Sequence, residues 1–355
     1  MTFVDLAVIG GGQSGLATAH VAARRGLRPL VLDAGSGPGG SWPAYYDSLT
    51  LFSPARFSGL PGMPFPGDPE RYPVRDEVID YLTARTAALD ADVRFGARVQ
   101  QVTATDGGFL ITTADGAVVR AASVVAASGG FGSPYRPALP GLESFTGRVL
   151  HAAEYRRPDE LAGTRVVVVG GGNSAVQIAA ELARRATVSI TTRGPLRFQR
   201  QRILGRDFHW WLTRTGLDTS RWGPRLLSGT VPVIDDGRYR AAIVAGNPDH
   251  RPFPRRFDGD RIVWADGTGE RVDVVVLATG YRPDLPYLTG TGAVGETGVP
   301  LHDGGVSTVL PGMGFVGLER QRSLASATLR GAGRDAGFVL DRLLRRAGRH
   351  VAAAR

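Results

Sequence analysis

One local pattern occurs twice in this chain: a short apolar run, a glycine-rich turn, and a segment with helical periodicity. In the first copy, a strand is predicted over residues 4–9, with an apolar run at 6–9, directly before Gly10, Gly12 and Gly15, and a helix is predicted over residues 14–25. The first glycine permits a tight turn, the second lets a pyrophosphate approach the backbone, and the third lets helix and strand pack closely. Asp33 ends the next predicted strand, where a carboxylate can accept hydrogen bonds from ribose hydroxyls. These features predict a dinucleotide-binding unit.

The second copy begins about 160 residues later, with Gly170, Gly172 and Ala175 after the apolar run 165–169. Its following strand, predicted over residues 188–192, ends without an acid and is followed by Arg193. A carboxylate there would repel a 2′-phosphate, whereas an arginine can pair with it. The second site is therefore predicted to bind NADPH in preference to NADH. A solvated surface charge is the alternative interpretation of Arg193.

The repeated unit predicts an α/β fold with two dinucleotide-binding, Rossmann-like domains. Further helices are expected over residues 75–89 and 325–344, and short strands between residues 93 and 127. Residues 200–258 are rich in aromatic side chains and arginine and have no clear periodicity.

Composition excludes several classes of function. The chain has 355 residues, 43% hydrophobic and 21% charged, which is typical of a globular protein. Cysteine is absent, and this excludes disulfides, thiolate metal sites and a redox-active cysteine pair. The histidines are dispersed and no H-E-x-x-H spacing occurs, so no metal site is predicted. No run is long enough to span a membrane and no signal peptide is evident, so a cytoplasmic protein is expected.

The net charge of +9 is carried without a single lysine, since all 42 basic residues are arginine. They are scattered, apart from a loose cluster at residues 193–206 and a basic tail at 342–355, and no nucleic-acid recognition module accompanies them. Nucleic acid is therefore not expected as a partner. The expected partners are a small-molecule substrate and O2. Whether the chain forms a homodimer is left open.

Four segments of the chain resemble the flavin-containing monooxygenases, the class B flavoprotein monooxygenases. Residues 39–42 match the family's G-G-x-W turn, and residues 278–281 match its A-T-G-Y segment. Residues 312–334 are similar to the closing strand and helix that face the flavin ring. The identifying pattern F-x-G-x-x-x-H-x-x-x-[FY] is matched by Phe145, Gly147, His151 and Tyr155. Residues 51–56 and 326–329 resemble the compact bacterial branch, which includes flavoproteins of arsenic-resistance operons.

The resemblance implies an FAD domain made of residues 1–157 and 276–355, with an NADPH domain of residues 158–275 inserted. NADPH would reduce FAD, and a flavin hydroperoxide formed with O2 would pass one oxygen to sulfur, nitrogen or trivalent arsenic, or to a carbonyl. The expected cofactor-binding residues are Gly10, Gly12, Gln13, Ser14, Gly15, Asp33, Gly40, Ser41, Trp42, Gly170, Gly172, Asn173, Ser174, Ala175, Arg193, Thr279, Gly280, Ser326 and Thr328.

The reactive flavin needs a dry enclosure, because a solvated hydroperoxide decays to hydrogen peroxide. Its candidate residues are Trp42, Phe52 and Ser53, with Tyr45, Tyr46 and Phe57 beside them. Many family members carry an Asn shortly after the G-G-x-W turn, and residues 51–54 here contain none. Residues 323–328 are expected to begin a helix whose N-terminus faces the flavin pyrimidine.

Three functions remain open at this stage. The first is an NADPH-dependent monooxygenase, and the second is an NADPH-dependent flavoprotein reductase that transfers electrons without oxygenation. A non-catalytic flavin or nucleotide sensor is the third. His151 is expected to control the geometry between the two domains, not to transfer protons.

Overall fold

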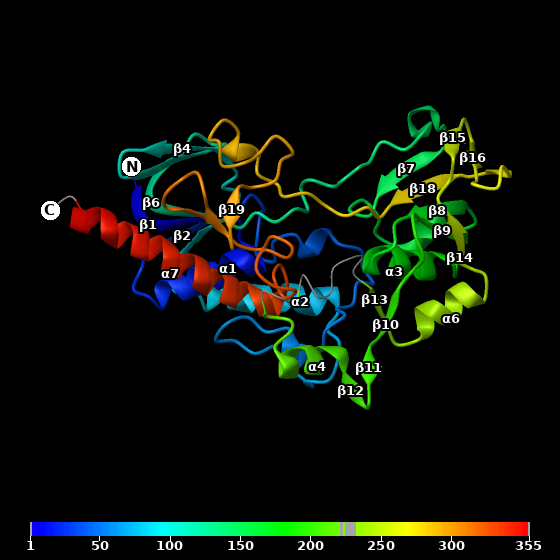
Figure 1. Ribbon diagram of the computed structural model, residues 1–355, viewed down its shortest axis with the longest axis horizontal. Coiled ribbons are helices and arrows are strands. Elements are labelled where there is room, and N and C mark those ends of the chain that lie inside the picture. Colours follow the sequence, from blue (N-terminus) through cyan, green and yellow to red (C-terminus); the bar gives the residue numbers. More distant parts are fainter. Residues whose placement is uncertain (1, 221–222, 224–231, 354–355) are drawn as a thin grey trace.

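The computed structural model describes residues 2–220, 223 and 232–353, and it consists of two lobes joined by two stretches of chain (Figure 1). Each lobe is built on its own sheet, and the strands of the second sheet lie, in chain order, between strands of the first. The predicted α/β fold, with one Rossmann-like unit inserted in another, is therefore confirmed.

The first sheet has the strand order β19-β20-β21-β6-β1-β2-β3, and β4 and β5 extend it through β6. Its central strands β21, β6, β1, β2 and β3 are parallel. The bounds are β1 Thr2–Ile9, β2 Pro29–Leu32, β3 Asp92–Arg94, β4 Val99–Thr105, β5 Gly108–Thr113, β6 Val118–Ala126, β19 His302–Asp303, β20 Val306–Ser307 and β21 Met313–Phe315.

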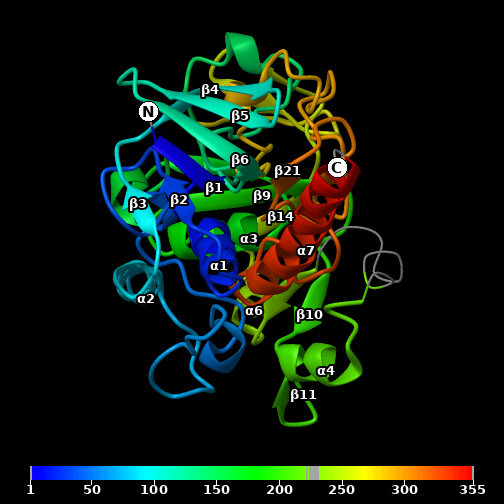
Figure 2. The same cartoon turned by 90° about the vertical axis from the view of Figure 1, so that its left-hand side faces the viewer.

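Side chains alternate between the two faces of this sheet, because successive residues of a strand point in opposite directions. Leu6 and Val8 pack against helices α1 (Gln13–Ala23) and α7 (Leu329–Ala353). Ala7 and Ile9 pack on the other face, against β4, β5 and the segment 285–293. Figure 2 shows α1 and α7 side by side on their common face. Helix α2 (Arg75–Ala87) packs beside α1.

The second sheet is wholly parallel, with the order β14-β9-β8-β18-β7. Helix α3 (Asn173–Leu182) covers one face, and the antiparallel strands β15, β16 and β17 cover the other. The bounds are β7 Arg148–His151, β8 Arg165–Val169, β9 Thr187–Thr192, β14 Asp249–Pro252, β15 Arg256–Asp258, β16 Arg261–Val263, β17 Gly269–Arg271 and β18 Val274–Leu277. Such burial on both faces explains the apolar runs at β8 and β18.

Between β9 and β14 the chain makes an excursion whose two ends pack on the second lobe and whose middle part leaves it. This excursion contains β10 (Phe198–Arg200), β11 (Arg202–Ile203), β12 (Arg206–Asp207), α4 (Phe208–Thr215), β13 (Val233–Asp235) and α6 (Arg238–Val244). Short 3-10 helices occur at Trp42–Ala44, Ala55–Phe57, Leu142–Ser144, Pro158–Leu161 and Pro286–Leu288.

Two predicted boundaries differ from the structure. By strand pairing, β7 belongs to the second sheet although it precedes residue 158, and β18 extends that sheet past residue 275. The C-terminal helix was expected from residue 325, with its start at residues 323–328, and it begins at Leu329. The reason is local: Ala327 has a φ of +69°, which no right-handed helix accommodates.

Candidate functional site

The first glycine turn lies at the carboxyl edge of the first sheet, where β1 ends. Gly10 has a φ of +108°, and a Cβ there would lie 2.5 Å from the Ala127 carbonyl oxygen. A Cβ at Gly15 would lie 1.8 Å from the Gly10 carbonyl oxygen, so helix α1 packs directly on the turn. Gly12 differs, because the nearest atom to a Cβ there is 3.9 Å away. The space over Gly12 is thus open, as a pyrophosphate cradle requires.

Asp33 follows β2 at the same edge and is 7% exposed. Its Oδ2 accepts a hydrogen bond from the Gly11 amide at 2.5 Å, and its Oδ1 accepts one from the Gly35 amide at 2.7 Å. These bonds hold the carboxylate against the glycine turn and leave a lone pair on each oxygen. Binding of a ribose at this position stays a prediction.

Three expected flavin-binding segments, distant in sequence, meet beside the open glycine. Gln13 accepts a hydrogen bond from the Trp42 indole nitrogen at 2.7 Å and donates one to the Ala327 carbonyl at 3.2 Å. A Cβ at Gly40 would lie 2.7 Å from the Cα of Gly12, so the G-G-x-W turn touches the cradle. The strained φ of Ala327 places its carbonyl at this junction, and such strain concentrates at functional sites.

The other predicted residues of the C-terminal segment shape the chain around Ala327. Ser326 is buried, and its hydroxyl oxygen accepts hydrogen bonds from the amides of Arg322 at 3.1 Å and Ser323 at 3.2 Å. The Thr328 hydroxyl accepts one from the Gly331 amide at 3.3 Å and so caps α7. The sequence pattern did not indicate these internal roles.

The second glycine turn repeats the geometry of the first at the end of β8. Gly170 has a φ of +141°, and a Cβ there would lie 2.3 Å from the Ala278 carbonyl oxygen. No atom lies within 4 Å of a Cβ built at Gly172, so this cradle is open as well. The buried methyl of Ala175 would lie 3.4 Å from a Cβ at Gly170. Asn173 accepts a hydrogen bond from the Ile234 amide at 3.0 Å.

Arg193 lies exposed just after β9, beside this second turn. Its neighbour Thr192 forms hydrogen bonds with the Gly194 carbonyl at 2.5 Å and with the His250 ring at 2.7 Å. Arg193 itself has no hydrogen bond or ion pair within the described part of the chain, so its guanidinium is free to meet a phosphate.

Tyr46 connects the two turns. Its hydroxyl donates a hydrogen bond to the Gln177 side chain at 2.6 Å. Gln177 belongs to the second turn of α3, which begins directly after the second glycine turn, whereas Tyr46 lies four residues beyond Trp42. Burial raises the pKa of Tyr46 and keeps the phenol protonated. The loop beside the first cradle therefore contacts the start of the second.

His151 is fully buried at the end of β7, where the two connecting stretches meet. Its Nδ1 accepts from the Ala153 amide at 3.1 Å, so its Nε2 carries the proton and donates to the Gly280 carbonyl at 3.1 Å. Desolvation lowers the pKa of His151 and keeps the ring neutral. The adjacent Thr279 hydroxyl donates to the Tyr135 carbonyl. This placement agrees with the expected structural role.

The remaining residues of the identifying pattern are packing residues. The Phe145 and Phe257 rings meet edge to face at 5.7 Å, and a Cβ at Gly147 would lie 2.5 Å from the Phe145 ring. Tyr155 is buried and donates to Glu181 at 2.8 Å. All of them lie in the second lobe or at its contact with the first.

The predicted enclosure residues divide between two places. Trp42 packs 5.6 Å from Tyr45, next to the first cradle. Phe52 stacks on His209 of α4 at 5.8 Å and lines a cavity of about 670 Å³ between the lobes, and the Ser53 and Ser58 hydroxyls are 3.0 Å apart. Whether this enclosure protects a flavin stays a prediction.

Sequence reasoning missed the polar network that attaches α4 to the first lobe. Buried Asp207 accepts from the Tyr72 hydroxyl at 2.6 Å and from His209 Nδ1 at 2.9 Å. Arg330 Nε lies 3.2 Å from the buried Asp218 carboxylate. Residues 200–258 have no periodicity, and a lone acid in such a region carries no local signal of a distant partner.

Residues 7–208 match the family described as pyridine nucleotide-disulphide oxidoreductase. The flavin-containing monooxygenase of Stenotrophomonas maltophilia superposes with a TM-score of 0.86 and 34% identity, covering 97% of this chain and 99% of that one.

Two relatives at the sequence level agree with this match. An oxidoreductase of Geobacillus kaustophilus described as CzcO-like is 33% identical over 96% of this chain and 98% of its own length. The rice indole-3-pyruvate monooxygenase YUCCA1 is 31% identical, covering 79% of this chain and 77% of its own length.

Among the helices of the described residues, none has the length and apolar character that a membrane span needs.

Proposed function

Because the chain belongs to the pyridine nucleotide-disulphide oxidoreductase family, and within it to the flavin-containing monooxygenases, we propose that it is an FAD-dependent, NADPH-using monooxygenase. The overall reaction consumes substrate, O2, NADPH and a proton, and it yields oxygenated substrate, NADP⁺ and water. The chain has no cysteine, so the disulphide chemistry in the family's name is not open to it.

One observation carries the proposal: the two open glycine cradles are connected through Tyr46, which contacts the first turns of α3. Bound FAD would supply the redox chemistry, and the protein would position it and exclude water. Gly12 and Gln13 would hold the FAD pyrophosphate, and Trp42 and Ala327 would lie beside it. Gly172 and Arg193 would hold NADPH, with the arginine on the 2′-phosphate.

The substrate is proposed as a small nucleophile with a sulfur, nitrogen or trivalent arsenic centre, or a carbonyl compound. The likeness of residues 51–56 and 326–329 to flavoproteins of arsenic-resistance operons supports including arsenic. The match to the rice indole-3-pyruvate monooxygenase supports including carbonyl compounds.

The test uses the purified, flavin-loaded protein with NADPH and isotopically labelled O2. Methyl phenyl sulfide and arsenite serve as probe nucleophiles, and a cyclic ketone serves as the probe carbonyl. We expect label in the product of at least one probe class and equal consumption of NADPH and O2. Unlabelled products, together with NADPH-dependent reduction of a quinone at the same rate without oxygen, would instead identify an electron-transfer reductase.

A further inference from the structure

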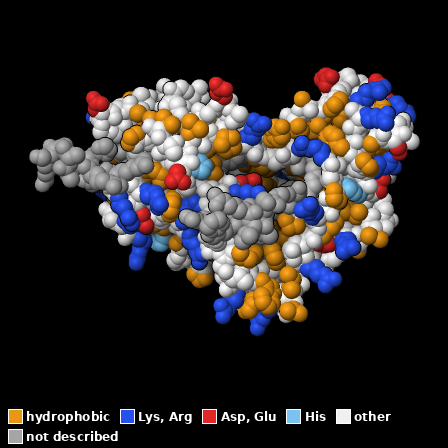
Figure 3. All heavy atoms as spheres, viewed as in Figure 1, with side chains coloured by type: hydrophobic (Ala, Val, Ile, Leu, Met, Phe, Trp, Pro, Cys, Tyr) orange, Lys and Arg blue, Asp and Glu red, His pale blue; other side chains and the backbone are white. Residues whose placement is uncertain are grey.

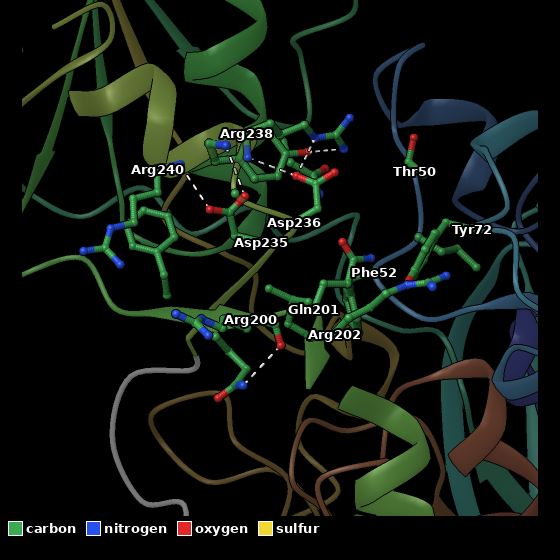
Figure 4. Close-up of a pocket in the computed structure, with 17 residues that line it drawn as sticks. Thr50, Phe52, Tyr72, Arg200, Gln201, Arg202, Asp235, Asp236, Arg238 and Arg240 are labelled. Atoms are coloured by element: carbon green, nitrogen blue, oxygen red, sulfur yellow. Dashed lines mark hydrogen bonds and ion pairs between the residues drawn. The ribbon is translucent and has the colours of Figure 1, made fainter. Parts of the chain in front are cut away.

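The cavity between the lobes has walls from both of them (Figure 4). Thr50, Phe52 and Tyr72 form its first-lobe wall, and β10, the following Gln201 and Arg202, β13 and the start of α6 form the opposite wall. Its volume of about 670 Å³ is within the range of ~300–1,000 Å³ typical of small-molecule sites. The cavity is therefore large enough for an organic substrate next to the segment predicted to enclose the flavin.

The acidic side chains of the lining are already engaged. Asp235 accepts hydrogen bonds from the amides of Tyr239 and Arg240, each at 3.1 Å. Asp236 accepts one from the Arg238 amide at 3.1 Å and pairs with its guanidinium at 3.6 Å. Both carboxylates thus hold the first turn of α6, and their negative charge is partly compensated there.

The four lining arginines are not equally engaged. Arg238 pairs with Asp236 and lies 4.7 Å from the Tyr239 ring, and the charge of Arg202 acts on the Tyr72 phenol and opposes the rise of its pKa. Arg200 and Arg240 line the cavity without a side-chain hydrogen bond or ion pair to any described residue. Four arginines against two aspartates leave a positive surplus, and two of the cations are available to a ligand.

Aromatic rings complete the lining. Phe52 and Tyr72 stand on one side, and Phe198 and Tyr239 stand on the other. The expected NADPH phosphate contacts Gly170, Gly172 and Arg193 are not among the lining residues. Gln177, in the second turn of α3, does line the cavity, so the cavity adjoins the predicted phosphate cradle without including its expected contacts. The guanidinium groups of Arg200 and Arg240 suit a carboxylate attached to a flat apolar body.

We propose that this cavity binds the carboxylate of an aromatic or similarly flat organic acid, with Arg200 and Arg240 as its specificity-determining residues. The apolar part would lie against Phe52, on the wall nearest the predicted flavin. This inference rests on the proposed function, because it names the substrate class of the same enzyme.

The test compares the carboxylate (phenylthio)acetate, a thioether, with its neutral amide, which keeps the sulfur and the ring but lacks the negative charge. The variants are Arg200→Gln, Arg240→Gln and the double variant. Arg197→Gln is the control, because this exposed arginine lies close in sequence and does not line the cavity. Kd for acid and amide is measured by calorimetry on the flavin-loaded protein, and KM is measured for both probes and for NADPH.

We expect each single substitution to raise Kd and KM for the acid by about tenfold, the effect of losing one charge-assisted hydrogen bond. Values for the amide and for NADPH, and all values of the control variant, should stay within about twofold. A weakened KM for NADPH with unchanged discrimination between acid and amide would overturn the inference and assign the arginines to coenzyme phosphate. Equal affinity of the unsubstituted protein for acid and amide would overturn it too.

The calorimetric measurement separates this inference from the proposed function. If the unsubstituted protein prefers the acid through these arginines but incorporates no oxygen, the binding inference stands and the monooxygenase proposal fails. If oxygenation occurs without any preference for the acid, the monooxygenase proposal stands and the binding inference fails.

Discussion

Gly12 and Gly15 lie three residues apart in the same turn, yet their surroundings differ. Gly15 is required by the protein itself, because a side chain there would enter the Gly10 carbonyl. A Cβ at Gly12 would meet no atom closer than the Gly40 Cα at 3.9 Å, an ordinary contact, so the fold does not require a glycine at that position. The proposed pyrophosphate, which would approach the backbone closely, accounts for a glycine at this position.

This difference predicts separable effects of two matched substitutions. Gly15→Ala should destabilise the fold by about 1–3 kcal/mol or more, because backbone atoms cannot move away cheaply. Gly12→Ala should leave the unfolding midpoint of the flavin-free protein unchanged and reduce the flavin that the protein binds. Thermal unfolding and the flavin absorbance of the purified variants measure both effects. A Gly12→Ala protein with full flavin content would contradict the pyrophosphate assignment.

Arg193 is the residue proposed to select the coenzyme. Arg193→Ala should raise KM for NADPH by about tenfold and leave KM for NADH nearly unchanged, because only NADPH carries the 2′-phosphate. Steady-state kinetics with both reductants provide the measurement. Arg184→Ala, at the distant end of α3, is the control for loss of an exposed positive charge. An unchanged ratio between the two coenzymes would reject the assignment.

At the level of elements, the position of α4 in the fold differs from what its place in the sequence suggests. It lies between β9 and β14 of the second sheet, yet its side chains dock on the first lobe through Asp207, His209 and the following Asp218. Figure 1 shows the middle of the excursion, β11, β12 and α4, below both lobes. The two lobes are thus joined by the excursion in addition to the two connecting stretches.

The Arg330–Asp218 ion pair should make a large contribution to this docking. Burial lowers the pKa of Arg330, and the Asp218 carboxylate opposes that effect. Arg330→Met would leave a buried carboxylate without its cation and should cost about 3 kcal/mol of unfolding free energy. Adding Asp218→Asn should recover part of this loss, because the uncompensated charge is removed as well.

A double-mutant cycle in denaturant measures this coupling. We expect an interaction free energy of about 1–3 kcal/mol between the two positions. Additive effects of the two substitutions would show that the pair does not hold α4 in place.

At the scale of the whole molecule, the two lobes are separated by a notch along the upper edge of Figure 3. Partly or fully buried histidines lie in both lobes and in α4. Burial lowers the pKa of each histidine with a described side chain, namely His20, His151, His209, His250 and His302. All five therefore favour the neutral form in the folded state.

A histidine whose folded-state pKa is lowered stabilises the protein above its unfolded pKa of about 6.5, and this contribution is lost as the pH falls. We expect the unfolding free energy to decrease between about pH 7 and pH 5 for this reason. Asp335, whose pKa is raised by burial, acts in the opposite direction, but it is a single group.

Denaturant titrations across this pH range test the expectation. The His151→Gln and His209→Gln double variant should show a smaller slope of unfolding free energy against pH than the unsubstituted protein. An equal slope, or stability that rises toward pH 5, would contradict it.

Much of the architecture could be predicted from local sequence. Gly10, Gly15 and Gly170 are required by contacts within a few residues or with the adjacent strand, so their spacing alone indicated two βαβ units. The start of α7 could not be predicted, because the helical pattern continues through Ala327. The backbone of Ala327 is left-handed where its carbonyl accepts a hydrogen bond from Gln13, which is 314 residues away in sequence.

The sequence by itself determined the two glycine turns, the strands and helices around them, and the absence of thiol chemistry, because each depends on residue type and short-range spacing. Only the tertiary structure decided the contact of Tyr46 with the second turn, the docking of α4 and the pairing of each aspartate in the cavity wall. These depend on which distant groups meet, and an isolated polar residue in an irregular segment gives no local indication of its partner.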